Sequence, residues 1–409
     1  MNDNVSFIHC ADLHIDSPFK GLSNLSPELF KDVRESTFKA LDRLVHVAIK
    51  KQVDFILIVG DLFDSEQQSM KAQSRLMDAF QQLYKHDIDV FVSYGNHDYL
   101  NGRMFYMDYP TNVHVFESEQ VSHFIYNKHQ KPTATIYGFS YENRSVHHNK
   151  AHEFHKEGDT PFHIGMLHGS LRSNTDHDVY APFQISDLNT KNFDYWALGH
   201  IHKRQIVGEN PPIVYPGNIQ GRSKKETGEK GCYYVEMDGQ HCSYSFVPLQ
   251  HIRFEELHVD AIQCQQPLDL ESLVDQAIKS VKEDIGKCIL RINMTNCSNE
   301  IEAWYQAGFV QEMIDVINER YEKEMDWVYI QSFHVDHQVI WDKDELMKAN
   351  HFIGELLRAF ESSEETDAYV QPLLHHRQAR KYLHSFTDEE KKEILSEAEE
   401  LLMHHLMKE

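Results

Sequence analysis

The chain has 409 residues, of which 41% are hydrophobic and 25% charged, with six cysteines and a formal net charge of −24. These proportions are those of an ordinary globular protein of two or three domains, and they exclude a disordered, collagenous or small disulfide-bonded chain. The cysteines show no CxxC spacing and follow no secretory leader, so a cytoplasmic protein with reduced thiols is expected. No apolar run approaches the roughly 18 residues of a membrane-spanning helix.

The acidic excess is unevenly distributed. Residues 1–250 carry a net charge of −7, residues 251–340 carry −10 and residues 341–409 carry −7. An acidic balance ordinarily argues against a nucleic-acid partner. Most of the excess lies in the last 159 residues, so the objection applies least to the first 250.

The first 250 residues alternate short β-type runs with segments of helical periodicity, the pattern of a layered α/β or α+β domain. Helices are expected over Pro27–Lys50 and Glu66–His86. Asp238-Gly239 is a turn signal between the last two strands, which predicts a hairpin. The expected strands are Val5–Cys10, Asp54–Val59, Ile88–Tyr94, Thr133–Phe139, Phe162–Leu167, Phe193–Leu198, Ile213–Tyr215, Cys232–Met237 and His241–Val247.

A smaller α/β unit is expected over residues 251–340. Its predicted elements are the strands Ile252–Val259, Cys288–Met294 and Trp327–Phe333 and the helices Leu268–Glu283 and Glu300–Lys323. Beyond residue 340 the pattern is helical, over Asp342–Phe360 and in a last helix opened by a capping box of Thr387 and Glu390. The apolar stripe of that helix fits packing on its own protein and docking on a partner equally well. The prediction is a layered sandwich over 1–250, a small cap domain over 251–340 and a helical region over 341–409.

Polar motifs follow five of the predicted strands. They are Asp12-Leu13-His14, Gly60-Asp61-Leu62-Phe63-Asp64, Gly95-Asn96-His97-Asp98, His168-Gly169 and Gly199-His200-Ile201-His202. Strand carboxyl ends form the rim where ligands bind in open sheets, so the motifs are expected to converge on one site. Each motif alone is a weak signal, because a lone Asp-x-His is expected by chance in a chain with 28 histidines. Five such motifs in this order, each after a strand, are not expected by chance.

The residue types in these motifs fit two divalent cations bridged by Asp61. The other expected ligands are Asp12, His14 and His202 for one cation and Asn96, His168 and His200 for the other. Mixed carboxylate and imidazole ligands suit Mn²⁺, Fe or Zn²⁺. Two such ions activate a bridging water and clamp the oxygens of a phosphoryl group during in-line displacement. His97 remains as a non-ligand acid beside the leaving oxygen, with Asp98 as its candidate partner.

In order and residue type, the five motifs resemble the signature of the calcineurin-like metallophosphoesterases. The resemblance implies metal ligation by the seven residues above and a catalytic role for His97. The opening Ile8–His14, the run Gly60–Asp64 and the turn Tyr215-Pro216-Gly217-Asn218 are similar to those of SbcD-like DNA repair exonucleases of the YhaO type. That group implies a manganese-dependent nuclease acting 3′ to 5′ on DNA ends, a homodimer in many members, and a partner ATPase of the structural-maintenance type with a long coiled coil.

Candidate DNA contacts follow the last metal motif. They are Lys203, Arg204, Arg222, Lys224 and Lys225. Such clusters attract backbone phosphates without reading sequence, although a solvated loop is an equally weighted interpretation. The segment Ile15–Gly21 is longer than the turn usual in the resembling family, and it is expected to form a lip that narrows or reshapes access to the site.

The motifs leave the substrate open, because the superfamily spans protein phosphatases, cyclic-nucleotide phosphodiesterases and DNA nucleases. Three functions are therefore considered. The preferred interpretation is a DNA exonuclease that acts in DNA repair or recombination with an ATPase partner. The lip and the acidic excess favour the alternative of a small phosphoester or cyclic nucleotide as substrate. A mainly scaffolding subunit of an ATPase–DNA complex is the third, and the intact ligand set argues against it.

Overall fold

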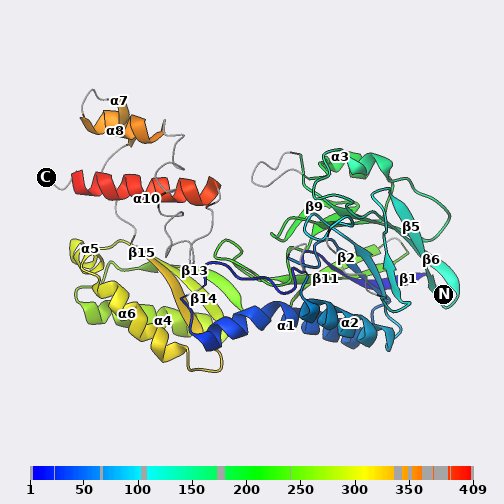
Figure 1. The fold of residues 1–409 in the computed structure, drawn as a ribbon, viewed down its shortest axis with the longest axis horizontal. Coiled ribbons are helices and arrows are strands. Elements are labelled where there is room, and N and C mark those ends of the chain that lie inside the picture. Colours follow the sequence, from blue (N-terminus) through cyan, green and yellow to red (C-terminus); the bar gives the residue numbers. More distant parts are fainter. Residues whose placement is uncertain are drawn as a thin grey trace.

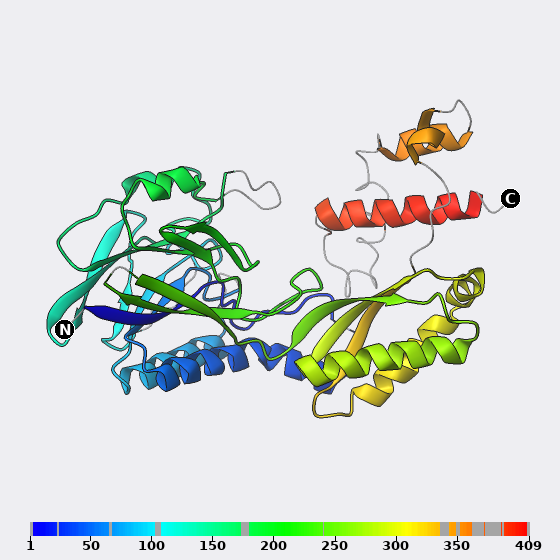
Figure 2. The same ribbon diagram turned by 180° about the vertical axis from the view of Figure 1, so that it is seen from behind.

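The structure is a computed structural model that describes residues 3–22, 24–64, 68–102, 108–172, 180–239, 241–335, 343–348, 352–361, 372, 386 and 388–406. Figures 1 and 2 show two lobes side by side, with the long helix α1 (Pro27–Lys51) running beneath both. The larger lobe contains strands β1 to β12, and the smaller lobe contains β13 to β15.

Two six-stranded mixed sheets form the larger lobe. The first has the order β12-β11-β1-β2-β3-β4, with β1 to β4 parallel and β11 and β12 forming the predicted antiparallel hairpin. Its strands are β1 (Asn4–Cys10), β2 (Phe55–Val59), β3 (Asp89–Ser93), β4 (Val113–Val115), β11 (Gly231–Asp238) and β12 (His241–Pro248). The second has the order β5-β6-β7-β8-β10-β9, with β6, β7, β8 and β10 parallel. Its strands are β5 (Ser122–Lys128), β6 (Lys131–Gly138), β7 (Phe162–His168), β8 (Tyr195–Gly199), β9 (Gln205–Glu209) and β10 (Pro212–Tyr215).

The two sheets pack face to face between helical layers. Central strands such as β2 are apolar at every position, because parallel strands covered on both faces have no side exposed to water. Phe7, Leu57 and Ile164 belong to the core between the sheets. Helices α1 and α2 (Met70–Tyr84) cover the outside of the first sheet, and α3 (Ile185–Asn189) with the 3₁₀ helix Lys150–Glu153 covers the second. The predicted layered α/β sandwich is confirmed.

The smaller lobe is a parallel three-stranded sheet with helices on one face. Its strands, in the order β13-β14-β15, are β13 (Arg253–Asp260), β14 (Cys288–Thr295) and β15 (Val328–Val335). Helices α4 (Pro267–Ile285) and α6 (Phe309–Tyr321) lie on the same side of this sheet in both views (Figures 1 and 2). The single helix predicted over Glu300–Lys323 is wrong: α5 (Asn299–Gln306) ends before Gly308, whose φ of 80° turns the chain before α6 begins.

The C-terminal region contributes α7 (Lys343–Lys348), α8 (Phe352–Glu361) and α10 (Asp388–Leu406). Thr387, the expected first residue of the capping box, lies outside the described residues. Strand β12 ends at Pro248 and β13 begins at Arg253, on either side of the boundary expected at residue 250. The three-domain division itself stays a prediction. No helix among the described residues has the length and apolarity to cross a membrane, and none of the six cysteines forms a disulfide.

The sequence pattern did not predict several short or polar elements. Strands β4, β5 and β9 and helix α3 were not expected. β5 and β9 are edge strands with several exposed positions, and β4 and α3 have only three and five residues, so none carries a clear apolar period.

An apolar cluster joins the two lobes. Phe19, which follows β1, is buried with Phe254, Ile289 and Trp327 of the smaller lobe. The Ile15–Gly21 segment therefore does more than border the site, because its Phe19 side chain is turned into the contact between the lobes. The Phe19 side chain thus packs in the core, and the effect of the segment on access to the site stays a prediction.

One carboxylate anchors this contact. Asp32 Oδ2 of α1 accepts hydrogen bonds from Lys287 Nζ at 2.5 Å and Trp327 Nε1 at 2.9 Å, both in the smaller lobe. Its Oδ1 lies 2.5 Å from Lys39 Nζ and 3.1 Å from His251 Nε2. Burial alone would raise the pKa of Asp32, but the hydrogen bonds from Lys287, Lys39 and Trp327 outweigh burial and hold that pKa well below its usual value.

Asp32→Ala should lower the free energy of unfolding by about 1–3 kcal/mol, because two lysines and an indole N–H lose their acceptor. Since folding lowers the pKa of Asp32, its contribution is fully present above the usual Asp pKa of about 3.9 and is lost as the pH falls below it. The effect of the substitution should therefore be larger at pH 7 than at pH 3. Urea unfolding at both pH values measures this.

Asp42→Ala is the matched control on the same helix. Asp42 pairs with Arg75 at 2.8 Å, but its side chain is 55% exposed, so its loss should cost under about 1 kcal/mol. Equal destabilisation by the two substitutions would show that Asp32 is no more than a surface ion pair.

Candidate metal centre

The seven predicted ligands meet where parallel strands of both sheets end. Strands β1, β2 and β3 deliver Asp12, His14, Asp61 and Asn96, and β7 and β8 deliver His168, His200 and His202. Five of the seven are buried, and His200 and His202 are partly exposed. His168 Nδ1 lies 3.0 Å from the carbonyl oxygen of Val59 at the end of β2, so the two sheets touch here.

One group of possible ligand atoms belongs to Asp12, His14 and His202, and these atoms lie within 4.8 Å of one another. His14 Nε2 and His202 Nε2 face each other at 3.1 Å. Burial lowers the pKa of both histidines, so both rings are neutral, which is the form of imidazole that binds metals.

A second group joins Asp12, Asp61 and His168 under the same criterion. Asn96 Oδ1 lies 3.0 Å from His168 Nε2 and 3.2 Å from His200 Nδ1, which brings the amide and the second imidazole to the same place. Burial also lowers the pKa of His168. The donor set is thus one of carboxylates, an amide oxygen and neutral imidazoles, which fits Mn²⁺, Fe or Zn²⁺.

Two buried carboxylates lie between these groups. Asp61 Oδ2 is 3.8 Å from His14 Nε2 and 3.6 Å from His168 Nε2. Burial raises the pKa of Asp12, and the charge of Asp61 raises it further. Bound cations would offset the cost of holding both carboxylates ionised, so the electrostatics of the residues present fit a metal centre.

The backbone at the site is held in unusual conformations. Asp12, His14, Asp61 and His200 have φ values of 50°, 43°, 51° and 94°, in the left-handed region that side chains other than glycine rarely adopt. Each such residue costs about 1–3 kcal/mol and persists only where its surroundings fix it. Clusters of this strain are typical of functional sites.

Three glycines leave room for the ligands. A Cβ on Gly60 would stand 2.2 Å from His168 Nδ1, and one on Gly95 would stand 2.3 Å from Asp61 Oδ1. On Gly199 it would lie 2.0 Å from the carbonyl oxygen of Val59. The glycines of three motifs thus allow the approach of the histidine and carboxylate side chains.

His97 lies beside the ligands. Its backbone N–H donates to Asp61 Oδ1 at 3.0 Å, and its Nδ1 lies 2.8 Å from the carbonyl oxygen of Asp64. A carbonyl can only accept, so Nδ1 carries a hydrogen and the opposite nitrogen, Nε2, points away from it. The ring stands edge-on to that of His14, with centroids 4.9 Å apart.

Asp98 does not contact the His97 ring as expected, and its carboxylate instead binds backbone N–H groups. Its Oδ1 accepts from the backbone N–H of Gly95 at 2.8 Å and its Oδ2 from that of Leu62 at 2.6 Å, whereas His97 has Asp64 as its partner. Burial, and next the charge of Asp61, raise the pKa of Asp98 to about 8. Asp98 therefore fastens the second motif to the third.

Comparison with known proteins decides the family. Residues 5–204 match the profile described as calcineurin-like phosphoesterase. The chain is also 35% identical over 407 residues to YhaO of Bacillus subtilis strain 168, described as an uncharacterized metallophosphoesterase, and the match covers 99% of both chains. The chain belongs to the calcineurin-like metallophosphoesterase family.

Two further relatives of this metallophosphoesterase carry names that refer to DNA repair or to a nuclease. One is the DNA double-strand break repair protein Mre11 of Sulfolobus acidocaldarius, 25% identical over 306 residues that cover 71% of this chain and 75% of the relative. The other is a component of the nuclease SbcCD from Staphylococcus saprophyticus, 26% identical over 289 residues that cover 63% of this chain and 74% of the relative.

Among the predicted DNA contacts, Arg222 lies at the edge of the centre. Its Nη1 pairs with Asp64, and its Nη2 lies 3.3 Å from His202 Nδ1. The side chain is only 17% exposed. Arg222 is thus part of the wall of the metal centre of this metallophosphoesterase.

The other four predicted contacts belong to the segments that contain His202 and Arg222. Arg204 lies over the Phe246 ring at 3.8 Å and 3.5 Å from Glu229. Lys203 and Lys225 are exposed, and Lys224 is partly exposed. The role of these residues as DNA contacts stays a prediction.

Sequence reasoning missed the role of Glu226. Its Oε1 lies 2.7 Å from His202 Nδ1, closer than Arg222 Nη2 at 3.3 Å. The only signal was an acid in an otherwise basic run, Lys224-Lys225-Glu226, close to the Tyr215 turn in sequence. Contact with His202 depends on folding, because the two residues are brought together from β8 and from the loop before β11.

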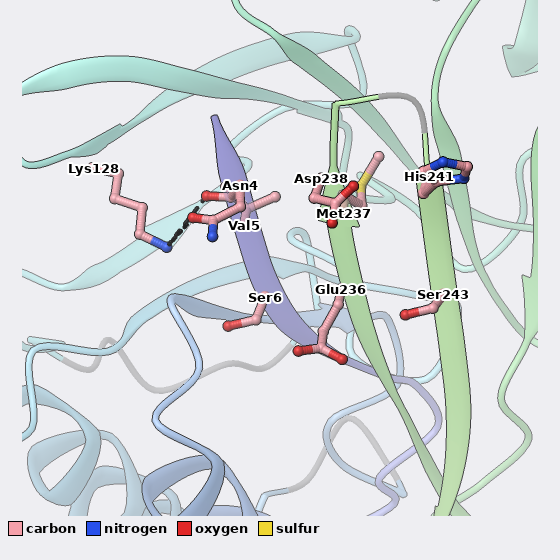
Figure 3. Close-up of a pocket in the computed structure, with 9 residues that line it drawn as sticks. All are labelled: Asn4, Val5, Ser6, Lys128, Glu236, Met237, Asp238, His241 and Ser243. Atoms are coloured by element: carbon pink, nitrogen blue, oxygen red, sulfur yellow. Dashed lines mark hydrogen bonds between the residues drawn. The ribbon is translucent and has the colours of Figure 1, made fainter. Parts of the chain in front are cut away.

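A polar pocket of about 280 Å³ lies elsewhere in this metallophosphoesterase. Figure 3 shows Asn4, Glu236, Asp238 and His241 around it, with the Lys128 amine bonded to Asn4. Asn4 begins β1, whereas Asp12 follows the carboxyl end of the strand. This pocket is therefore at the opposite end of the sheet from the candidate ligands.

Gly60→Ala should weaken Mn²⁺ binding by about 10-fold or more, because the new Cβ would stand 2.2 Å from His168 Nδ1 and the ring must move. Gly158→Ala is the matched control: φ is 77° there and 79° at Gly60, but a Cβ on Gly158 meets nothing within 4 Å. Both variants bear similar backbone strain, and only one blocks a ligand. Calorimetric titration with Mn²⁺ compares them, and equal affinities would refute the packing argument.

Proposed function

We propose that the protein is a metal-dependent DNA exonuclease that hydrolyses phosphodiesters at DNA ends, in the 3′ to 5′ direction, in DNA repair or recombination. The observation that carries the proposal is the convergence of ligand-type side chains and His97 at five strand ends of two sheets. The names of two relatives, a double-strand break repair protein and a nuclease component, support DNA as the substrate.

The proposed metal ligands are the seven residues of the five motifs. They are Asp12, His14, Asp61, Asn96, His168, His200 and His202. The proposed ions are Mn²⁺, and when bound they supply an activated water and offset the charge of the phosphoryl oxygens. Asp61 would be able to bridge the two ions, because its Oδ2 lies 3.8 Å from His14 Nε2 and 3.6 Å from His168 Nε2.

His97 is proposed to stabilise or protonate the departing 3′ oxygen. The Asp64 carbonyl holds its Nδ1 at 2.8 Å, which leaves Nε2 as the nitrogen that faces the substrate. The hydrogen bond from the His97 backbone N–H to Asp61 Oδ1 links the position of His97 to that of a proposed ligand. Asp98 supports the catalytic loop through Gly95 without contacting the reacting atoms.

The exposed cations near His202 are proposed to bind the DNA backbone. Lys203, Arg204, Lys224 and Lys225 belong to the loops beside His202, and Arg222 reaches the centre itself. Asp64 and Glu226 both pair with the Arg222 guanidinium, so most of its positive charge is compensated. Arg222 is therefore proposed to hold these side chains in position beside the centre more than to attract DNA.

A coiled-coil ATPase of the structural-maintenance type is the proposed partner, docked on the helices of residues 341–409, in a cytoplasmic complex of two copies of this chain. The name of one relative, a component of nuclease SbcCD, supports a second subunit as partner. In Figures 1 and 2, α8 and α10 stand apart from the strands of the larger lobe.

His97→Ala should retain Mn²⁺ and slow the shortening of an end-labelled DNA duplex by about 10²–10⁴-fold, because it removes the proton donor and no ligand. Asp61→Asn should lose both metal and cleavage. Gel assays with Mn²⁺ and metal analysis of the same samples measure the two quantities. His86→Ala, at an exposed histidine after α2, should behave as the wild type.

Cleavage by His97→Ala at the wild-type rate with metal bound would exclude His97 as the acid. Hydrolysis of a chromogenic phosphodiester without cleavage of duplex or single-stranded DNA would favour a small phosphoester as substrate. No hydrolysis of either substrate until an ATPase is added would favour a subunit that depends on its partner.

Lys203→Ala should weaken binding to a duplex oligonucleotide and reduce the slope of log K against log salt by about 1, because one phosphate contact is lost. Hydrolysis of the chromogenic diester should be unchanged. Lys131→Ala is the control, since Lys131 is exposed and begins β6 at the end of the sheet away from the ligands. An equal loss on both substrates would argue against a DNA-backbone contact.

A further inference from the structure

A carboxylate lies directly behind one ligand of the centre. Glu226 belongs to the loop between β10 and β11, and its side chain is 14% exposed. Its Oε1 lies 2.7 Å from His202 Nδ1. Its Oε2 accepts from Asn218 Nδ2 at 2.8 Å and from the backbone N–H of Arg222 at 2.7 Å. Both carboxylate oxygens are therefore occupied as acceptors.

The contact with Glu226 determines which nitrogen of His202 carries the hydrogen. A carboxylate can only accept, so a bond to it requires N–H at Nδ1. The lone pair is then on Nε2, and this atom faces His14 Nε2 at 3.1 Å. A neutral ring held in this way presents its metal-binding nitrogen to the Asp12, His14 and His202 group.

Arg222 offers the opposite arrangement. Its Nη2 lies 3.3 Å from the same Nδ1 and, as a donor, would require Nε2 to carry the hydrogen. The Glu226 contact is shorter, at 2.7 Å against 3.3 Å, and the Arg222 guanidinium has acceptors in Asp64 and in Glu226. Geometry therefore favours the bond from His202 to Glu226.

We propose that Glu226 is a positioning residue that fixes the ring and the tautomer of His202, and so tunes one of the two metal sites selectively. Glu226 has no contact of this kind with His168, which belongs to the second ligand group. The inference rests on the proposed metal centre and adds to it a difference between the two sites.

Glu226→Gln keeps the size of the side chain but replaces one acceptor oxygen with an NH₂ donor. The groups that contact the carboxylate, on His202, Asn218 and Arg222, are all donors, so one of them loses its acceptor. The affinity of the first site for Mn²⁺ should fall by about 10–100-fold, while the second site retains its wild-type affinity. Calorimetry and native mass spectrometry should then find one ion in place of two at intermediate Mn²⁺ concentrations. Glu226→Asp, which restores two acceptors, should recover part of the loss.

Glu229→Gln is the matched control. Glu229 is in the same loop and pairs with Arg204 at 3.5 Å, away from His202. This variant should bind two ions as the wild type does. Circular dichroism and thermal unfolding of all three variants check that the fold is intact.

The tautomer of His202 is the second readout, and it is measured without metal. Nitrogen-15 NMR of histidine-labelled protein should show the hydrogen on Nδ1 in the wild type and its redistribution in Glu226→Gln. A role limited to holding the loop would not move this signal.

The proposal would be overturned by equal weakening of both sites in Glu226→Gln, or by a hydrogen on Nε2 of His202 in the wild type. Two-site Mn²⁺ binding by the wild type that persists unchanged in Glu226→Gln would also overturn it and leave the proposed function intact. Failure of the wild type to bind Mn²⁺ at all would instead count against the metal centre itself.

Discussion

The arrangement of the larger lobe depends on the cost of burying the carboxylates of Asp12 and Asp61 near each other. Burial opposes the ionisation of both, and the charge of Asp61 raises the pKa of Asp12 further, whereas the neighbouring histidines hold the pKa of Asp61 below its usual value against the effect of burial. Nearby positive charge is therefore what stabilises such a site. The fold meets this requirement by ending parallel strands of two sheets at one point, where four imidazoles and an amide oxygen surround the carboxylates. Left-handed backbone at four ligands is the conformational cost of that convergence.

The segment that follows His14 also forms part of the contact between the two lobes. Within a few residues of His14, Ser17 Oγ donates to Asp64 Oδ1 at 3.4 Å, and Phe19 enters the core shared with the smaller lobe. Helix α1 continues the same path and presents Asp32 to Lys287 and Trp327. The position of the smaller lobe and the first metal motif are thus coupled through one short, well-packed segment, which contains further left-handed residues at Asp16 and Phe19.

Charge near the centre is balanced locally rather than by an extended basic surface. Arg222 is surrounded by Asp64 and Glu226, and Lys230 Nζ donates to the carbonyl oxygen of His202 at 3.1 Å. These cations support the ligands from behind. In a chain with a net charge of −24, the proposed attraction for a phosphate backbone would have to come from bound metal ions together with the few exposed lysines beside His202.

The sequence by itself determined the layered α/β class, most strands to within one or two residues, and the grouping of the five motifs. Apolar periodicity and strand-end motifs are local signals, and local signals survive without a structure. Tertiary structure alone decided what the polar residues contact. It gave the His97 ring Asp64 as its partner in place of Asp98, and it brought Glu226 to His202. It also placed Phe19 between the lobes and divided the predicted helix at Gly308. The contacts of Asp98 with Leu62 and of Glu226 with His202 join residues on different loops. Their distances depend on how the sheets pack, which no sequence period records.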